Sequence, residues 1–256
     1  MIETTDDGFL GGRLMIRQPA RGPHRAGLDA VLLAACLDET TAGRVLDLGA
    51  GVGVAGLAIA ARLEGVRVTL AEIDPDTAAL ARANLDLNAT ELGGRASVLV
   101  ADVLARAPDR EAAGLLGNAH DHVIMNPPFH MADRGRSSPN DDRARAHALV
   151  PSDLEAWVRA AAALVHPRGT LTVIFRADEL PRLLSAIGTR FGSLSLLPVH
   201  PRTDEAAHRL ILRGRPQGRA PLRMLPPLVL HEADGSWTTE ADAILKGDAV
   251  RRKWWP

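Results

Sequence analysis

Along the chain, from residue 44 onward, short apolar runs alternate with longer stretches that are rich in alanine and leucine. The apolar runs are hydrophobic at most positions, which is typical of parallel strands that are buried on both faces of a sheet. The stretches between them have the length of helices. This alternation predicts a parallel sheet that is covered by helices on both faces. We expect strands at 44–50, 66–74, 96–103, 121–128 and 169–177, and helices at 53–63, 75–89, 109–117, 151–165 and 178–190.

The alternation ends after residue 190, where a short polar loop separates two apolar runs. The runs are "SLSLLPV" (193–199) and "HRLILRG" (208–214), and their spacing predicts an antiparallel pair at one edge of the sheet. We therefore expect a Rossmann-like, doubly wound α/β fold with a mostly parallel, seven-stranded sheet and an antiparallel edge hairpin. The expected divisions are an N-terminal segment (1–43), a core (44–216) and a C-terminal extension packed on the core (217–256).

Composition narrows the class of protein. With 256 residues, of which 46% are hydrophobic, the chain can bury a substantial core. The formal net charge is only −1, so no overall field favours nucleic acid or a membrane, and any basic surface must be local. The single cysteine, Cys36, excludes an internal disulfide, and no apolar stretch approaches the roughly 20 residues of a membrane-spanning helix. The first residues lack the features of a signal peptide, so we expect a cytoplasmic protein without a membrane partner.

The first candidate site is a glycine-rich turn in "LDLGAGVGVAGLAIA", between the first expected strand and its helix. Gly49, Gly51 and Gly53 would let the backbone approach a ligand beside the start of a helix, although a tight connection alone would also use glycine. The second strand ends in "AEID", where an acidic residue could accept hydrogen bonds from both ribose hydroxyls. Glu72 is the first candidate and Asp74 the second. The spacing fits neither a dinucleotide fingerprint nor a phosphate-binding loop, so the expected ligand lacks a phosphate chain.

These motifs resemble those of the class I S-adenosylmethionine-dependent methyltransferases, whose first motif looks like "DLGAGVG" and whose second strand ends like "EIDP". The resemblance covers most of the chain, and it implies the class I methyltransferase fold and S-adenosylmethionine as the cofactor. It places the glycine turn against the methionine and ribose, Glu72 at the ribose, Ile73 against the adenine, and Asp102 in "VADV" at the adenine amine. Without the resemblance, Asp102 could equally be a helix cap or a surface carboxylate. The cofactor residues implied in this part of the chain are Asp47, Gly49, Gly51, Gly53, Glu72, Ile73 and Asp102.

The fourth expected strand ends in "NPPF", residues 126–129. An adenine amine is a poor nucleophile, because its lone pair is delocalised into the ring, and two acceptors for its hydrogens would redirect that lone pair. The side chain of Asn126 and the carbonyl of Pro127 offer such acceptors, and Phe129 could stack on an extruded base. The motif resembles that of amino-methyltransferases acting on adenine, cytosine or glutamine amides. We expect Asn126, Pro127 and Phe129 to be catalytic, with Asn126 also contacting the cofactor; the alternative is a proline-rich turn after a strand.

The segment "FLGGRLMIRQPARGPHRAGLDAVLLAA" (9–35) resembles the start of the bacterial tRNA (adenine-N(6))-methyltransferase family that modifies the adenine 3′ of the anticodon in a valine tRNA. The resemblance implies that the N-terminal segment closes the methionine end of the cofactor pocket. Asp29 could also be a helix N-cap. The matching cofactor-binding candidates are Gln18, Arg25, Gly27, Leu28 and Asp29.

The resemblance therefore implies methyl transfer to the exocyclic amine of an adenine in RNA, with tRNA near the anticodon or another structured RNA as the substrate partner. Methylation of a glutamine amide in a protein, or of adenine in rRNA or DNA, stays open, because the same motif serves these acceptors. A non-catalytic module that keeps a cofactor fold is a further alternative, against which the intact "NPPF" argues. No sequence feature fixes the target nucleotide or the oligomeric state.

Three other features remain. Residues 176–223 carry nine arginines against four acids, a local basic region that could hold phosphates or be a solvated face. The terminal "RRKWWP" could bind a nucleic-acid strand or dock the tail on the domain, and we favour docking. The polar stretch 129–150 has the length of a functional loop. We expect no metal site, because His120 and His122 lack the spacing of a ligand set.

Overall fold

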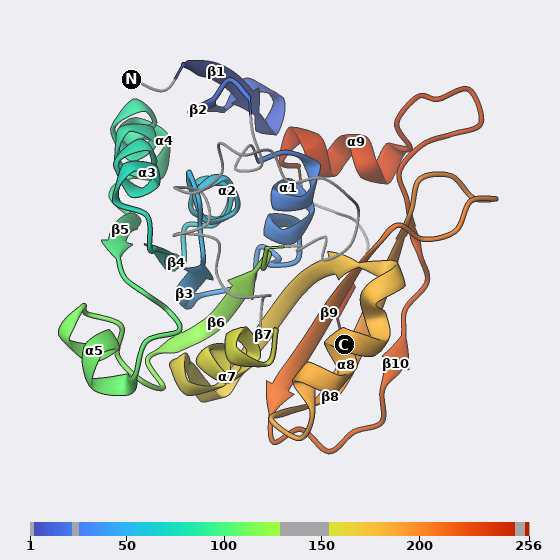
Figure 1. Cartoon of the computed structure of the whole chain (residues 1–256). Helices are drawn as coiled ribbons and strands as arrows, with labels where there is room; N and C mark the ends of the chain where they lie inside the picture. Colours follow the sequence, from blue (N-terminus) through green and yellow to red (C-terminus); the bar gives the residue numbers. More distant parts are fainter. Residues whose placement is uncertain (1–2, 22–25, 129–153, 249–253, 256) are drawn as a thin grey trace, which may run out of the picture.

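The computed structural model describes residues 3–21, 26–128, 154–248 and 254–255. Figure 1 shows a central twisted sheet with helices on both faces, as the sequence predicts. Arg25, Phe129, the stretch 129–150 and most of "RRKWWP" lie outside the described residues, so the predictions made for them stay predictions.

Seven strands form the body of the sheet, and two short strands extend it beyond the predicted seven. The order is β10-β8-β9-β7-β6-β3-β4-β5, with β11 also pairing with β8. Every pair is parallel except those of β9, which runs antiparallel to both β7 and β8, so the predicted edge hairpin is confirmed. The strands are β3 (Gly43–Leu48), β4 (Val66–Glu72), β5 (Ala96–Val100), β6 (His120–Met125), β7 (Val165–Arg176), β8 (Phe191–His200), β9 (Arg209–Pro216), β10 (Arg223–Met224) and β11 (Leu228–Val229).

The helices fall on two sides of this sheet and bury two hydrophobic clusters. Side chains alternate along each strand, so in β6 Ile124 faces one cluster while Val123 and Met125 face the other. The first cluster includes α1, α2 and α9, and the second includes α7 and α8. The helices are α1 (Leu28–Ala35), α2 (Val54–Arg62), α3 (Pro75–Leu87), α4 (Ala89–Leu92), α5 (Ala107–Ala112), α7 (Leu154–Leu164), α8 (Leu180–Ile187) and α9 (Thr239–Lys246), with short 3-10 turns η1 (Leu10–Gly12) and η2 (Ala177–Glu179).

Some boundaries differ from the prediction for local reasons. The expected helix 109–117 is the shorter α5, which ends before Gly114, whose φ of +93° is left-handed and stops a helix. The expected helix 75–89 is confirmed as α3, which breaks at Asn88 before α4 begins.

An N-terminal hairpin was not predicted. It consists of β1 (Thr4–Phe9) and β2 (Leu14–Pro19), which pair antiparallel and lie outside the main sheet (Figure 1). Leu14 and Ile16 of β2 are fully buried and belong to the same cluster as α1 and α2. The hairpin is therefore part of the domain core, and the division at residue 43 stays a prediction.

The two tryptophans of the C-terminal tail dock on the domain. Trp254 is buried and its indole N–H donates to a carboxylate oxygen of Glu240 at 2.9 Å. The indole N–H of Trp255 donates to the backbone carbonyl of Cys36 at 2.9 Å, and the guanidinium of Arg213 lies 5.4 Å from the centre of a Trp255 ring. These contacts favour the prediction that the tail docks on the domain, and they argue against the alternative that its tryptophans form an open surface for nucleic acid.

Within the described residues, no helix combines the length and the apolar character needed to cross a bilayer.

Candidate functional site

The predicted site residues of the core lie at the carboxyl ends of four adjacent parallel strands, β6, β3, β4 and β5. Strand β3 lies between β4 and β6, and its last residue, Leu48, pairs with Ala71 of β4 and Met125 of β6. The chain segments that follow these strand ends are therefore neighbours. In open α/β sheets, ligands bind in the crevice outside this edge.

The glycine turn between β3 and α2 needs left-handed backbone at three positions. Gly49, Gly51 and Gly53 have φ values of +75°, +58° and +95°, a region that side chains with a Cβ rarely adopt. A Cβ on Gly49 would lie 2.6 Å from the ring of Trp157, whereas a Cβ on Gly51 would meet no atom of the described residues within 4 Å. The turn is packed on one side and open on the other, where a ligand could approach its backbone.

Glu72 connects the end of β4 to this turn. One carboxylate oxygen accepts the backbone N–H of Gly51 at 2.9 Å, and the other accepts that of Asp74 at 3.0 Å. Each oxygen keeps capacity for a further hydrogen bond. Ile73, the next residue, exposes 48% of its surface, an unusual fraction for a large apolar side chain beside polar groups.

Asp74, the second candidate for a ribose contact, is an N-cap. Its side chain accepts the backbone N–H groups of Asp76 and Thr77 at the start of α3, at 2.8 and 2.9 Å. Of the two acids, Glu72 is therefore the one held against the glycine turn.

Asp47 lies beneath the turn. It is fully buried, and its carboxylate accepts the backbone N–H of Gly56 in α2 at 2.9 Å. Burial raises the pKa of this carboxyl from 3.8 to about 7, and the negative charge of Glu72 adds to the increase. Asp47 thus holds the first turn of α2 in place.

Asp102 lies at the same edge as Glu72. Strand β5 is the neighbour of β4, and the backbone N–H of Ala101, just after β5, donates to the carbonyl of Glu72 at 2.9 Å. Asp102, the next residue, therefore lies close to the end of β4. Asp102 is exposed, and its side chain accepts the backbone N–H of Leu104 at 2.8 Å. It is a turn carboxylate with its side chain open to solvent.

Asn126 follows β6 and has an unpaired acceptor. Its side-chain oxygen is buried and makes no hydrogen bond within the described part of the chain. Leaving such a group unpaired costs about 1–3 kcal/mol, and a buried polar atom of this kind needs an explanation. Pro127 is buried and Pro128 is exposed. The arrangement offers a hydrogen-bond acceptor to a donor that arrives at this edge.

Trp157 of α7 is a site residue that the sequence analysis missed. Its ring packs against Gly49, and its indole N–H is buried without a partner among the described residues. The only signal was its position in the apolar pattern of the expected helix, which does not distinguish a core residue from one beside a ligand.

The N-terminal candidates form a separate group. Gln18 is buried; its side-chain amide donates to Asp7 at 2.9 Å and accepts the backbone N–H of Ala26 at 2.9 Å. Gly27 is the N-cap of α1 and Leu28 is its first residue, so the interpretation of Asp29 as the N-cap is wrong.

Asp29 makes an ion pair instead. Its carboxylate lies 2.9 Å from the Nε of Arg209, and less than a third of each side chain is exposed. The pair joins α1 to the first residue of β9. No sequence pattern links two residues so far apart, which is why this contact was not predicted.

The arginines of 176–223 do not form one basic surface. Because β9 is antiparallel to β7, Arg209 pairs with Arg176 at the carboxyl edge, whereas Arg215 pairs with Gly192 at the opposite edge. Arg213 is largely buried against Trp255, and this burial lowers the pKa of its guanidinium. At the carboxyl edge, three arginines are paired with acids, as Arg176 with Asp178, Arg202 with Glu205 and Arg209 with Asp29.

Within the residues that the structure describes, no group of three or more His, Cys, Asp or Glu side chains is placed to hold a metal ion. The two histidines of β6 contact neighbouring oxygens of the protein instead. Nδ1 of His120 lies 3.2 Å from the carbonyl of Leu164, and Nδ1 of His122 lies 2.9 Å from the hydroxyl of Thr170.

Comparison with known proteins identifies relatives over most of the chain. The family model described as Methyltransferase small domain matches residues 25–193. A tRNA1(Val) (adenine(37)-N6)-methyltransferase of Porphyromonas gingivalis is 34% identical over 229 residues, covering 84% of this chain and 85% of the relative. A release factor glutamine methyltransferase of Chlorobaculum tepidum is 26% identical, covering 77% of this chain and 67% of the relative. The solved structure of a predicted O-methyltransferase from Agrobacterium tumefaciens is 38% identical, with a TM-score of 0.73, covering 87% of this chain and 97% of its own.

The raised pKa of Asp47 predicts a pH-dependent stability. Between its unfolded value of 3.8 and its folded value of about 7, the folded protein holds a proton that the unfolded chain has lost. The contribution of the Asp47 carboxyl to the free energy of unfolding therefore falls as pH rises through that range. Asp47→Asn keeps the acceptor for Gly56 and cannot ionise, so its stability relative to wild type should rise by about 4 kcal/mol between pH 4 and pH 8. Urea unfolding of both proteins across this range measures the difference, and parallel pH profiles would contradict the assignment.

Proposed function

The chain belongs to the methyltransferase small domain family, and from this we propose that it methylates the exocyclic amine of an adenine in RNA, with tRNA near the anticodon as the substrate. S-adenosylmethionine is its cofactor, and its fold is that of the class I methyltransferases, as the sequence predicts. The observation that carries the choice of an amine or amide acceptor is the side-chain oxygen of Asn126 at the carboxyl edge, which is buried and has no hydrogen-bond partner among the described residues. The relative from Porphyromonas gingivalis, which covers most of the chain, is named for the same reaction.

The residues at the carboxyl edge fit the proposed cofactor. The open side of the glycine turn at Gly51 offers backbone to a ligand, and the Glu72 carboxylate beside it can accept the hydrogens of two ribose hydroxyls. Ile73 offers an exposed apolar surface to an adenine ring, and Asp102 a carboxylate to its amine. We further propose that Gln18, Gly27 and Leu28 close the methionine end.

When bound, S-adenosylmethionine supplies a methyl group on a positively charged sulfur. Asn126 and Pro127 then have one task, which is to accept the two hydrogens of the target amine and so direct its lone pair. Proline has no N–H and a fixed φ, so the Pro127 carbonyl stays in place without a competing donor nearby. The proton can leave after transfer, so this chain needs no strong general base.

Two acceptors fit a nitrogen with two hydrogens better than a hydroxyl with one. This distinguishes an amine or amide from the oxygen acceptor named for the Agrobacterium protein. It does not distinguish adenine from a glutamine amide, which the relative from Chlorobaculum tepidum is named for. The longer and more similar match to the adenine enzyme favours RNA. An RNA substrate also implies a cytoplasmic location.

Methyl transfer from labelled cofactor tests the proposal directly. We expect the wild-type protein to label tRNA from a strain that lacks this enzyme, and mass spectrometry of the digested tRNA to identify N6-methyladenosine. A release factor with its acceptor glutamine, rRNA, DNA and a small catechol should take up little label. Label on the release factor alone would replace adenine by the glutamine amide, and label on the catechol alone would contradict an amine acceptor.

The proposed role of Asn126 predicts that its substitution lowers the rate of methyl transfer and changes the affinity for the cofactor little. Asn126→Ala should lower kcat by roughly 10²–10³, because one preorganised acceptor of the transition state is removed. Asn126→Asp should retain more activity than Asn126→Ala, since a carboxylate still presents an acceptor oxygen, although its burial as a charge is costly. Single-turnover rates measure the order, with calorimetric cofactor affinity as the control for folding. An alanine variant with the wild-type rate would leave the segment as a structural turn.

The two edges of the sheet predict where RNA binds. Arg176 and Arg202 lie at the carboxyl edge with Asn126, while Arg215 and Arg219 are exposed near the opposite edge. Reversing either pair to Glu makes the same change in net charge. We expect the first pair of substitutions to weaken tRNA binding by about 10-fold or more and to reduce its salt dependence, and the second pair to change it by less than about 3-fold. Filter binding at several salt concentrations measures both, and equal losses would show that only the overall charge matters.

A further inference from the structure

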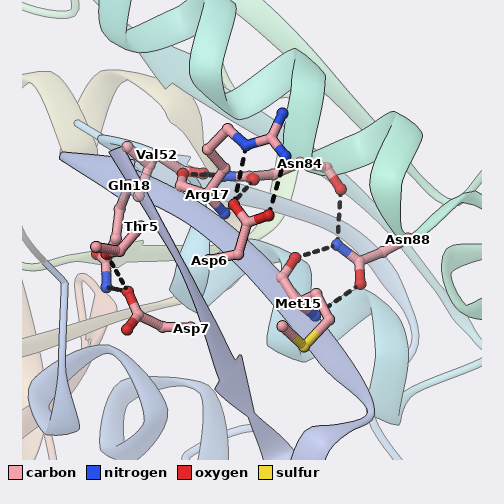
Figure 2. A network of polar contacts seen from close by, with 9 residues as sticks. All are labelled: Thr5, Asp6, Asp7, Met15, Arg17, Gln18, Val52, Asn84 and Asn88. Carbon is pink, nitrogen blue, oxygen red and sulfur yellow. Dashed lines mark hydrogen bonds and ion pairs between the residues drawn. The ribbon is translucent and has the colours of Figure 1, made fainter. Parts of the chain in front are cut away.

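The free edge of β2 is paired with side chains instead of a strand. Asn88 of the α3–α4 junction accepts the backbone N–H of Met15 at 2.9 Å and donates to the Met15 carbonyl at 2.7 Å. One turn earlier in α3, Asn84 accepts the backbone N–H of Arg17 at 2.7 Å and donates to the Arg17 carbonyl at 3.0 Å. Figure 2 shows the two amides side by side along the strand. Each asparagine therefore imitates the backbone of a neighbouring strand.

The spacing of the two asparagines matches the spacing of the strand. Residues four apart on a helix lie on one face about 6 Å apart, and alternate residues of a strand are separated by about 6.6 Å. Both side chains are buried, with 0% of Asn84 and 7% of Asn88 exposed. Replacing either would leave backbone groups of β2 buried without partners.

The third hydrogen bond of each amide differs. The second N–H of the Asn88 amide donates to the carbonyl of Asn84 in its own helix, at 2.8 Å. The second N–H of the Asn84 amide donates to the carbonyl of Val52, at 3.0 Å, within the glycine turn between β3 and α2 (Figure 2). Asn84 thus contacts the hairpin and the turn at once, whereas Asn88 contacts the hairpin alone.

The strand held by Asn84 continues to the other half of the proposed cofactor site. Arg17 is followed by Gln18, whose side chain accepts the backbone N–H of Ala26, just before the start of α1. Hydrogen bonds from Val52 to Asn84 to Arg17, the backbone of β2 from Arg17 to Gln18, and the hydrogen bond from Ala26 to Gln18 therefore connect the glycine turn to the segment that we propose closes the methionine end.

We propose that Asn84 is a positioning residue for the cofactor site, which joins the N-terminal hairpin to the glycine turn so that cofactor binding and hairpin docking stabilise each other. The inference rests on the proposed role of the glycine turn in binding S-adenosylmethionine. Asn84 touches neither the reacting atoms nor the open side of the turn, and it acts through the Val52 carbonyl. Because such coupling is reciprocal, a change in hairpin docking should alter cofactor affinity, and cofactor binding should alter the stability of the docked hairpin.

Asn84→Asp and Asn88→Asp are a matched pair that tests this. Each keeps the shape and the acceptor oxygen and loses the amide hydrogens, and only the first removes the bond to Val52. Both should speed hydrogen exchange of the β2 amides. Affinity for S-adenosylmethionine, measured by calorimetry without RNA, should fall about 10-fold in Asn84→Asp and by less than about 3-fold in Asn88→Asp. Saturating cofactor should slow β2 exchange in the wild type and in Asn88→Asp, but not in Asn84→Asp.

Equal losses of affinity in the two variants would overturn the proposal, because they would trace the effect to a loosened hairpin and not to the Val52 bond. Unchanged affinity in Asn84→Asp would overturn it as well. If the aspartate variants do not fold, Asn84→Ser and Asn88→Ser make the same comparison with smaller, uncharged side chains. A wild-type protein that binds cofactor but does not methylate RNA would contradict the proposed substrate only, since neither measurement involves RNA.

Discussion

The turn from β3 into α2 is the constraint on which the rest of the carboxyl edge depends. Its three glycines have left-handed backbone, and this conformation presents N–H and C=O groups to two other elements, β4 and α3. The N–H of Gly49 donates to the carbonyl of Ala71, the N–H of Gly51 to Glu72, and the carbonyl of Val52 accepts from Asn84. Trp157 packs on the remaining side, where no side chain on Gly49 would fit. A small change in the turn would therefore move the ends of β4, α3 and α7 together.

Two carboxyl groups near this turn have different environments and so can do different work. Asp47 is fully buried, and the pKa of its carboxyl is raised to about 7, so it suits a fixed structural contact with α2. Glu72 is partly exposed, and its two oxygens face backbone N–H groups of the turn and of the segment after β4. A carboxylate in that position can bind a neutral diol without being desolvated completely. In this pair, the difference in burial separates the structural role of Asp47 from the binding role that we propose for Glu72.

The two ends of the chain are built into the same core as the helices of the first cluster. Leu14 and Ile16 of the hairpin and Ile244 and Trp254 near the C-terminus belong to one cluster with α1 and α2. Polar contacts then fix their positions, as with Gln18 at the start of α1 and Trp255 on the Cys36 carbonyl. The segments outside the sheet are thus fixed to the domain by apolar packing and by polar contacts together.

Features that depend on neighbours in the chain could be predicted before the structure was known. Apolar runs of strand and helix length specify the doubly wound sheet, glycine at alternate positions specifies the left-handed turn, and two prolines specify a stiff strand end after Asn126. Contacts between residues far apart in the sequence became known only from the folded structure. Asn84 lies 67 residues from Arg17, and Asp29 lies 180 residues from Arg209. The folded structure also decided that Asp74 caps α3 while Glu72 meets the turn, and that the arginines divide between two edges. The reason is that periodicity and spacing report which face a residue occupies, whereas the partner on that face is chosen by the packing of elements far apart in the chain.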